Sequence, residues 1–372
     1  MKPTTSFDID WLSDQSHILS AESLLKDYHQ KDIFNEPGLI WLKTSGTTSN
    51  HEKWIGLKKQ AILASAHSVN QFIKVNEKDI WLNTLPLYHI GGLSILARSH
   101  LSGSVVYNRS IKPWSPLTFN QHIQSTQASL ISLVPTQVYD IVQAKMSCPK
   151  TVRAVFVGGG HLTPELYKKA RQLNWPLLTT YGMTEMSSQV ATAELSSLDN
   201  QEYPKLKLLA HIKAKLNKDS LLLLDGPSKY TYKVTIINHN IEVQKADDYI
   251  TTEDQVELKE SYLNFKQRIS DRVKVLGYLV DKSSLNKKLS SLAESKKFDP
   301  RKFVIQNMKN TRRENDLVVF FEDYHFSQIQ NLIDDLNKNL KTYEKIQRIY
   351  RVNLLERTEL GKFKSQLKIF RQ

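Results

Sequence analysis

Hydrophobic residues recur with two different periods in the first half of the chain, and this pattern predicts helices alternating with strands. Between residues 58 and 74 a helix is expected, because apolar side chains return at steps of three and four residues: Ile62, Ala66, Val69 and Ile73. Short apolar runs that stop at proline or glycine predict strands within 79–86, 129–135, 152–160 and 177–185. Strands alternating with helices favour an α/β fold with a mainly parallel sheet, whose ligands bind beyond the carboxyl ends of the strands.

The pattern of apolar and polar residues changes after about residue 200. Apolar and polar residues then alternate as in antiparallel strands, within the segments 206–216, 220–226 and 232–243. This alternation predicts a smaller β subdomain that follows the parallel part.

From about residue 267 the pattern predicts a separate α+β unit with strands within 316–323 and 346–352. Between these strands one helical face is expected to carry Phe326, Ile329, Ile333, Leu336 and Leu340. We place the main boundary at Arg268. The prediction is a large N-terminal domain, 1–267, and a smaller mobile C-terminal domain, 268–372.

The composition is typical of a folded, soluble protein, with 40% apolar and 24% charged residues. The longest apolar runs, such as 221–224, are far shorter than the ~18 residues of a membrane span, so no membrane insertion is expected. The N-terminal segment has acidic residues at Asp8 and Asp10, which argues against an export signal. A single cysteine, Cys148, fits a reducing compartment, and we expect a cytoplasmic protein.

The net charge of +13 is compatible with a nucleic-acid surface or with a positive field that attracts small anionic ligands. Lysine and arginine are spread along the chain without a long basic block, and there is neither an RNP-like aromatic motif nor a Cys/His zinc spacing. Small anionic ligands are therefore the expected partners, and nucleic acid is not.

A phosphate loop is indicated by the segment TSGTTSNHEKW, which begins at Thr44. Its hydroxyl residues surround Gly46, and Lys53 follows seven residues later. Such residues let backbone N–H groups turn toward a polyphosphate, and a lysine adds a point charge. The segment is not the GxxxxGK[ST] loop, and a Ser/Thr-rich stretch alone is more typical of an ordinary polar turn.

The segment TSGTTSNHEK also resembles the phosphate loop of the adenylate-forming (AMP-binding) superfamily of acyl-CoA synthetases, luciferases and peptide-synthetase adenylation domains. Further resemblances follow in the order of that family: LPLYHIGGL with His89, GGG at 158–160, YGMTE at 181–185, YITTED ending at Asp254, RISDRVKVLG from Arg268 to Gly277, and RTELGK ending at Lys362. An ordered set of this kind is highly specific.

The resemblance implies an enzyme that forms an acyl-adenylate from ATP and a carboxylic acid and then transfers the acyl group to coenzyme A. It implies phosphate contacts from Thr44, Ser45, Gly46, Thr47, Thr48 and Lys53, and adenine contacts from Gly159, Gly160, Tyr181 and Gly182. It further implies ribose contacts from Asp254 and Arg268, and a hinge segment reaching Gly277, which is also expected among the cofactor-binding residues. Catalytic roles are implied for His89, Thr184, Glu185 and Lys362. Glu185 is the expected Mg²⁺ ligand, since a carboxylate with phosphate oxygens and waters is typical magnesium ligation.

Some positions depart from the family pattern. Ser49 stands where glycine is usual in the phosphate loop, Gln267 where glycine commonly precedes the hinge arginine, and Glu253 where the ribose motif usually has glycine. Only 43 residues precede the phosphate loop, which implies a shortened N-terminal region.

Within the superfamily, three segments resemble the o-succinylbenzoate-CoA ligases of menaquinone biosynthesis: LPLYHIGGLSILAR, SLVPTQ and YGMTEMSSQV. That substrate is a dicarboxylate, so its pocket needs a cation for the carboxylate that is not activated. Arg98 is the candidate, because a guanidinium that follows an apolar run needs an anionic partner if it is buried. His89, Ser188 and Gln189 are expected beside it. An exposed arginine at a helix end remains the alternative.

Three other functions stay open: another aryl- or acyl-CoA ligase, a basic nucleic-acid-binding protein, and a non-catalytic adenylate-binding module. The expected partners are a small carboxylic acid, ATP and CoA. A homodimer is compatible with the sequence.

Overall fold

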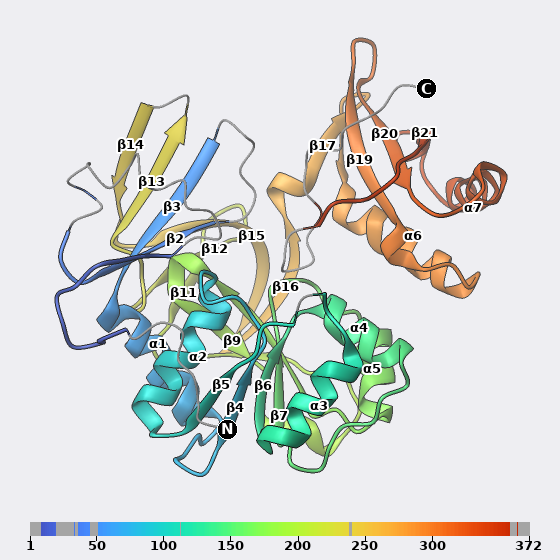
Figure 1. Ribbon diagram of the computed structural model, residues 1–372. Helices are drawn as coiled ribbons and strands as arrows, with labels where there is room; N and C mark the ends of the chain where they lie inside the picture. The colour runs from blue at the N-terminus through green and yellow to red at the C-terminus, as the bar shows by residue number, and fades with distance from the viewer. Residues whose placement is uncertain are drawn as a thin grey trace.

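The computed structural model describes residues 9–19, 33, 36–44, 51–111, 113–237, 240–357 and 363. Within these ranges no helix combines the length and the apolar character needed to cross a membrane. Figure 1 shows a large unit and, set apart from it, a smaller unit made from the last quarter of the chain.

The centre of the large unit is a parallel sheet, as the alternating pattern predicted. Its strands are β4 (Ile80–Asn83), β5 (Val105–Asn108), β6 (Leu130–Leu133), β7 (Ala154–Val157) and β8 (Leu177–Met183). They lie in the order β8-β7-β6-β4-β5, and each neighbouring pair is parallel. Because all five strands run the same way, the loops at their carboxyl ends meet at one edge of the sheet.

Helices cover both faces of this sheet (Figure 1). The helices α1 (Lys59–Phe72) and α2 (Ile90–Ser102) share one core with Trp81 of β4, and α3 (Pro116–Thr126), α4 (Pro135–Gln143) and α5 (Pro164–Gln172) share another core with Leu82. Neighbouring strand residues thus point to opposite faces, as the pleat of a strand requires. At the start of α5 the sequence has a threonine followed by a proline, a pattern that predicts the first turn of a helix. The structure agrees, since the Thr163 hydroxyl accepts a bond from Leu166 N at 3.2 Å and Pro164 is the first helical residue.

The antiparallel strands predicted after residue 200 are present, but the prediction that they make a smaller β subdomain is wrong. Six strands extend the parallel sheet on its β8 side in antiparallel fashion: β9 (Ser188–Thr192), β10 (Leu206–Leu208), β16 (Tyr262–Arg268), β15 (Ile250–Lys259), β12 (Leu221–Asp225) and β11 (Lys213–Leu216). A second sheet contains β1 (His17–Leu19), β2 (Leu39–Lys43), β3 (His51–Lys58), β13 (Tyr232–Ile237) and β14 (Asn240–Lys245). The later strands therefore pair with earlier ones, β10 with β9 and β13 with β3, and form no sheet of their own.

The smaller unit follows the 3₁₀ turn Ile269–Asp271 and has its own core. It comprises β17 (Arg272–Val275), β18 (Tyr278–Asp281), α6 (Lys282–Ser295), β19 (Phe303–Asn310), β20 (Glu314–Phe321), α7 (Phe326–Lys338) and β21 (Ile346–Arg351). Three further 3₁₀ turns lie at Thr184–Met186, Leu195–Asp199 and Pro300–Lys302. We call this part the C-terminal unit.

The expected buried face of the helix in the C-terminal unit needs one correction. Ile329, Ile333 and Leu336 are buried as expected, but Phe326 is 54% exposed. Phe326 is the first residue of α7, and its ring contacts Phe321 edge-on with the ring centres 6.1 Å apart. One turn at the end of a helix can lie beyond the core, and periodicity alone does not show where the core ends.

Candidate active site

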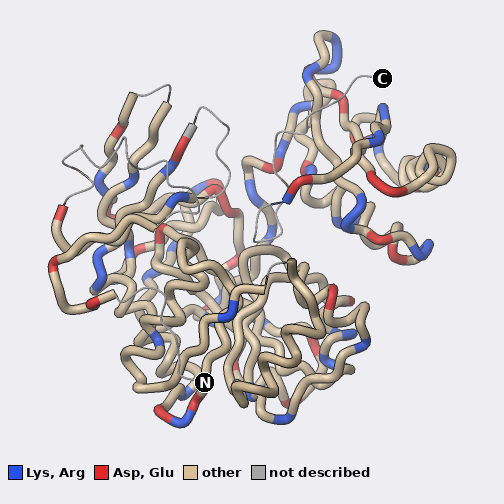
Figure 2. The backbone as a smooth tube through the Cα atoms, in the orientation of Figure 1, with Lys and Arg blue, Asp and Glu red and all other residues tan. Residues whose placement is uncertain are grey.

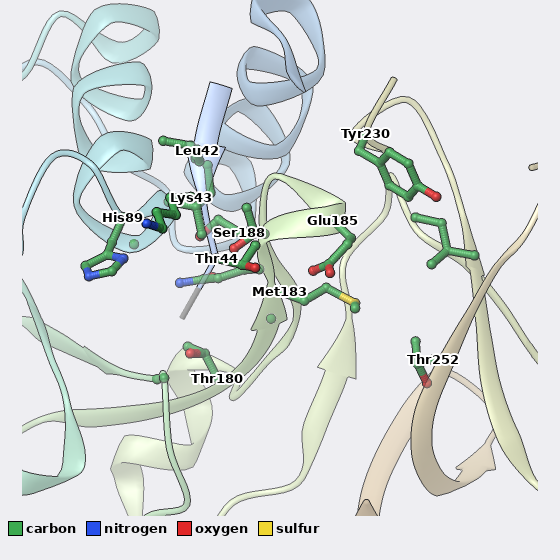
Figure 3. A pocket seen from close by; sticks show the side chains of 18 of the residues that line it. Leu42, Lys43, Thr44, His89, Thr180, Met183, Glu185, Ser188, Tyr230 and Thr252 are labelled. Carbon is green, nitrogen blue, oxygen red and sulfur yellow. The ribbon is translucent and has the colours of Figure 1, made fainter. Parts of the chain in front are cut away.

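A cavity of about 630 Å³ opens at the carboxyl ends of the parallel strands, where the fold class places ligands. Eleven of the residues singled out from the sequence line it: Thr44, Lys53, His89, Arg98, Gly159, Gly182, Thr184, Glu185, Ser188, Gln189 and Arg268. They come from loops and strands far apart in the chain. In Figure 3 His89 lies at one end of the cavity and Tyr230 near the other, with Ser188 and Glu185 between them. We call this cavity the main cavity.

Lys53 and Glu185 form an ion pair in the main cavity. Lys53 lies on β3, and Glu185 lies in the 3₁₀ turn Thr184–Met186 that follows β8. Lys53 Nζ donates to Glu185 Oε1 at 2.6 Å, and the two side chains are 36% and 16% exposed. Each charge thus neutralises the other. A phosphate group and a cation could replace these partners, the phosphate on Lys53 and the cation on Glu185.

The residues present fit a magnesium ion held together with a nucleotide. In the described part of the chain no group of three or more His, Cys, Asp or Glu side chains is arranged to hold a metal ion. Glu185 offers one carboxylate beside the main cavity, which is the usual protein contribution when substrate phosphates and waters complete the magnesium shell.

Asp254 is fully buried between Tyr181 and Arg268. Its carboxylate accepts bonds from Arg268 Nε at 2.6 Å, Arg268 Nη2 at 2.9 Å and the Tyr181 hydroxyl at 2.6 Å. Asp254 on β15 is paired directly opposite Arg268 on β16, so the sheet register sets the ion pair. Burial, and then the charge of Asp254, raise the pKa of Tyr181 well above its usual value, so the phenol stays a donor. A ribose hydroxyl that bonded Asp254 would replace one of these donors.

A second cavity, of about 960 Å³, lies next to the main cavity and shares Gly159, Thr180, Gly182 and Arg268 with it. It is also lined by Gly160 and by Tyr181, whose ring centre lies 6.3 Å from that of Phe265. Apolar and aromatic walls beside a buried carboxylate suit a flat base joined to a polyhydroxyl group. The residues expected to contact adenine and ribose are thus gathered here.

Two glycines at the site are required by the backbone. Gly159 has a φ of +77°, in the left-handed region that glycine adopts readily. Gly182 faces the backbone of β9, where an added Cβ would lie 2.2 Å from the carbonyl oxygen of Ser188. Ser187 and Ser188 themselves have positive φ values of 52° and 112°. Strained backbone of this kind concentrates at functional sites.

We expect Gly182→Ala to lower the free energy of unfolding by about 1–3 kcal/mol, because β8 and β9 would have to separate to admit a methyl group. Thermal unfolding of the purified variant measures the effect. Gly91→Ala is the matched control, since its Cβ would meet only Leu85 Cδ1, at 3.4 Å, and alanine is preferred in a helix. A Gly182→Ala protein as stable as the parent would contradict the close approach.

Arg98 decides between the two alternatives that the sequence left open. It lies within α2, is 1% exposed and lines the main cavity. Its guanidinium carbon lies 5.6 Å from the ring centre of Trp81 and 5.5 Å from that of Phe156. The surrounding apolar groups lower its pKa to about 9 by burial. Arg98 is therefore a buried cation, and the exposed alternative is wrong.

The polar surroundings of Arg98 are incomplete. Arg98 Nη2 lies 3.5 Å from Ser188 Oγ, which is a weak contact. Among the described residues, neither Arg98 Nε nor the buried Gln189 Oε1 has a hydrogen-bond partner. An unpaired buried guanidinium costs free energy, so this end of the cavity is suited to an anion that accepts from Arg98.

His89 lines the main cavity, whereas Gly277 lies away from both cavities. His89 is the residue before α2, and its ring centre lies 4.9 Å from that of Tyr88 at the cavity wall. Gly277 lies in the turn between β17 and β18 and lines neither cavity; its N–H donates to Glu314 Oε2 at 2.8 Å. Five other predicted residues lie outside the described residues: Ser45, Gly46, Thr47, Thr48 and Lys362.

The sequence reasoning missed residues that the second sheet brings to the main cavity. Tyr230 precedes β13, and its N–H donates to the carbonyl oxygen of Glu185 at 2.9 Å, which fixes the turn that carries this carboxylate. Lys233 on β13 adds positive charge to the cavity wall, whereas Lys43 on β2, also at the wall, is paired with Glu52 at 2.7 Å. The strand β13 was expected, but nothing in its alternation indicated that it pairs with β3 beside the cavity.

The chain belongs to the AMP-binding enzyme family. The model of that family matches residues 26–226, which is more than half of the chain and includes most of the main cavity.

Similar proteins include 2-succinylbenzoate–CoA ligases. The one from Staphylococcus epidermidis is 32% identical over 150 residues, which are 40% of this chain and 31% of the relative. The one from Listeria monocytogenes serotype 4b is 31% identical over 186 residues, 50% of this chain and 39% of the relative. The chain thus matches less than half the length of these curated relatives.

Solved structures share the fold. The o-succinylbenzoate CoA synthetase of Bacillus subtilis in complex with the acyl-adenylate intermediate OSB-AMP has a TM-score of 0.72 at 22% identity, over 90% of this chain and 69% of that one. The same synthetase in complex with ATP and magnesium ion has a TM-score of 0.69 at 19% identity, over 93% and 77% of the two chains. The fold predicted from the motifs is confirmed.

Proposed function

We propose that the protein is an ATP-dependent, AMP-forming acid–CoA ligase that converts o-succinylbenzoate to o-succinylbenzoyl-CoA. The observation that carries the proposal is the position of Arg98, a buried cation in the same cavity as the Lys53–Glu185 pair. A dicarboxylate fits this arrangement, because one carboxylate can pair with Arg98 while the other is activated. The names of the relatives agree with this substrate.

In the first half-reaction, an oxygen of the second carboxylate would attack the α-phosphorus of ATP. The bond from that phosphorus to the bridging oxygen of pyrophosphate breaks, and pyrophosphate leaves with the electron pair. Catalysis then consists mainly of positioning and of neutralising charge. We assign Lys53 and Thr44 to the phosphates, Thr184 to the α-phosphate, and Asp254 with Arg268 to the ribose.

Mg²⁺ bound at Glu185 would neutralise charge on the phosphates of ATP. The protein itself holds the Glu185 carboxylate at the cavity wall. The main-chain bond from Tyr230 N to Glu185 O fixes the turn that carries this side chain. Lys53 is available to phosphate once a cation has taken over its carboxylate partner. Lys53 and the ion held by Glu185 would then both serve the same nucleotide.

In the second half-reaction, the thiolate of coenzyme A would attack the acyl carbon, and AMP would leave. We propose that the C-terminal unit moves between the two half-reactions about a boundary at residue 268, and that Lys362 serves the first of them. Separate hydrophobic cores on either side of the turn Ile269–Asp271 support this division.

We also propose that the protein works in the cytoplasm on small molecules and not on nucleic acid. Figure 2 shows lysine and arginine scattered along the backbone of both units and interspersed with acidic residues. This distribution favours solvated charge over a nucleic-acid interface.

The test is a panel of carboxylic acids assayed for AMP release that depends on both ATP and CoA. We expect o-succinylbenzoate to be the preferred acid over monocarboxylate aryl analogues. Turnover of a monocarboxylate alone would leave an acid–CoA ligase of another specificity. Failure of every acid to support ATP–pyrophosphate exchange would favour a non-catalytic adenylate-binding protein.

A further inference from the structure

Arg301 connects the C-terminal unit to the large unit. It lies in the 3₁₀ turn Pro300–Lys302. Its guanidinium donates to Asp299, the residue that precedes this turn, with Nη2 2.9 Å from Asp299 Oδ2. Arg301 Nη1 also donates to Asp140 of α4, in the large unit. The guanidinium carbon lies 4.5 Å from the ring centre of Tyr139 on the same helix. One side chain thus makes an ion pair and a cation–π contact across the boundary.

The partners of Arg301 are placed by the fold next to the main cavity. Helix α4 directly follows β6, and Leu133 and Val134 at this junction line the cavity. Val138 and Ile141 of α4 are buried in the large core, so Tyr139 and Asp140 lie on the opposite side of the helix, toward the C-terminal unit. Burial raises the pKa of Tyr139 to about 12.

The same arginine supports the end of the described chain. The carbonyl oxygen of Arg301 accepts a bond from Arg357 Nη2 at 2.8 Å. Arg357 is paired with Phe363 in an antiparallel bridge, and its guanidinium carbon lies 3.7 Å from the Phe363 ring centre. Arg357 and Phe363 flank, in sequence, the segment that ends in Lys362.

We propose that Arg301, with Asp140 and Tyr139, is a positioning contact that holds the C-terminal unit in the orientation used for adenylate formation. We call these three residues the interdomain clamp. The inference rests on the proposed function for the half-reaction it serves, while the clamp itself concerns only the orientation of the two units. A second ion pair across the boundary, Lys169–Glu294 at 3.6 Å, is more exposed and contributes little.

The first measurement reports orientation without activity. Dyes on Lys168→Cys in the large unit and Lys338→Cys in the C-terminal unit, in a Cys148→Ser background, report their separation by energy transfer. We expect one dominant transfer efficiency in the parent, and a broadened or shifted distribution in Asp140→Asn and in Tyr139→Ala. Asp140→Glu, which keeps the charge, should restore most of the parent distribution. Gln143→Ala, an exposed change on α4, is the control and should leave it unchanged.

The second measurement separates the half-reactions. Asp140→Asn should lower ATP–pyrophosphate exchange roughly 3- to 10-fold through kcat, with the KM for ATP unchanged, because the pair is only partly buried. Thioester formation from supplied acyl-adenylate should not fall. An unchanged energy-transfer distribution in Asp140→Asn, or equal loss in both half-reactions, would overturn the clamp. If the parent shows no exchange with any acid, the proposed function fails, whereas the energy-transfer result still decides the clamp.

Discussion

Arg98→Met should lower kcat/KM for o-succinylbenzoate roughly 10- to 150-fold and leave the KM for ATP near its starting value. A charge-assisted bond lost from a buried carboxylate typically costs ~1.5 to 3 kcal/mol, and ~1.4 kcal/mol corresponds to a factor of ten. The loss should be specific to the dicarboxylate, since Arg98 lies among Trp81, Phe156 and Ser188 and not beside Lys53 or Asp254. A monocarboxylate analogue should lose much less.

The same variant should be more stable than the parent when no ligand is bound. In the described structure Arg98 is buried without a carboxylate partner, and replacing such a charge by an apolar side chain of similar length removes the cost of desolvation. Thermal unfolding without ligand measures this. A variant that is more stable than the parent but turns over o-succinylbenzoate more slowly would mark Arg98 as a binding residue that the fold itself does not need.

Arg153→Met is the matched control for stability. Arg153 makes two bonds of 2.7 Å to the buried carboxylate of Asp79, outside the main cavity. Its removal leaves the Asp79 carboxylate without a counter-ion among the described residues, with only the bonds from Ser129 Oγ and Asn76 N. Unfolding should therefore occur at a lower temperature, while the choice of acid does not change. Unchanged o-succinylbenzoate kinetics in Arg98→Met, or a parent enzyme that prefers the monocarboxylate, would remove the physical basis for the dicarboxylate and leave a broader acid–CoA ligase.

The sequence predicted the parallel half of the fold well because its signals are local. A helical period identified α1, and a threonine followed by proline identified the start of α5. Buried parallel strands are short apolar runs, and β6 and β7 end close to the proline and glycine that were taken as stops. Each of these features depends only on neighbouring residues.

The antiparallel half was mispredicted because strand pairing is not local. The alternation in 206–243 indicates strands correctly, but it does not show which strand each of them pairs with. The pairing of β13 with β3 brings Lys233 and Tyr230 to the cavity, and it also places Lys53 opposite Thr235. This pairing makes neighbours of residues that are more than 170 positions apart in the sequence. The pattern of a single segment cannot show such a contact.

For the candidate site, the motifs indicated residues that line the two cavities, but not the contacts between them. Tyr181, Asp254 and Arg268 were assigned separately to adenine and ribose, whereas the structure joins them in one hydrogen-bonded group. The state of Arg98 depends on its burial, which an apolar run before an arginine leaves undecided. The pairing of Lys53 with Glu185 likewise arises only where β3 meets the turn after β8.

That pairing leads to the other large expected effect. Glu185→Gln should reduce ATP–pyrophosphate exchange about 100- to 1,000-fold, the usual cost of removing one preorganised group that serves the transition-state charge. A neutral amide is a poor magnesium ligand compared with a carboxylate, and the main cavity offers Glu185 as the proposed site for that ion. Exchange assays across a range of Mg²⁺ concentrations measure the loss.

Binding of ATP without magnesium should change in the opposite direction in Glu185→Gln. In the parent, Lys53 Nζ is engaged by Glu185 at 2.6 Å, so a magnesium-free nucleotide must compete with this carboxylate and is repelled by its charge. Removal of the carboxylate frees Lys53, and the affinity for ATP in the presence of a chelator should rise severalfold, as expected for a partly exposed ion pair. Calorimetric titration with a chelator present measures this affinity. Glu194→Gln provides the matched control, because Glu194 accepts from Lys207 at 2.7 Å in an equivalent pair that lines neither cavity. Two results would contradict the proposal that phosphate replaces Glu185 as the partner of Lys53, and with it the assignment of Glu185. One is a lower affinity of Glu185→Gln for ATP in the presence of a chelator, and the other is a similar effect of the two substitutions.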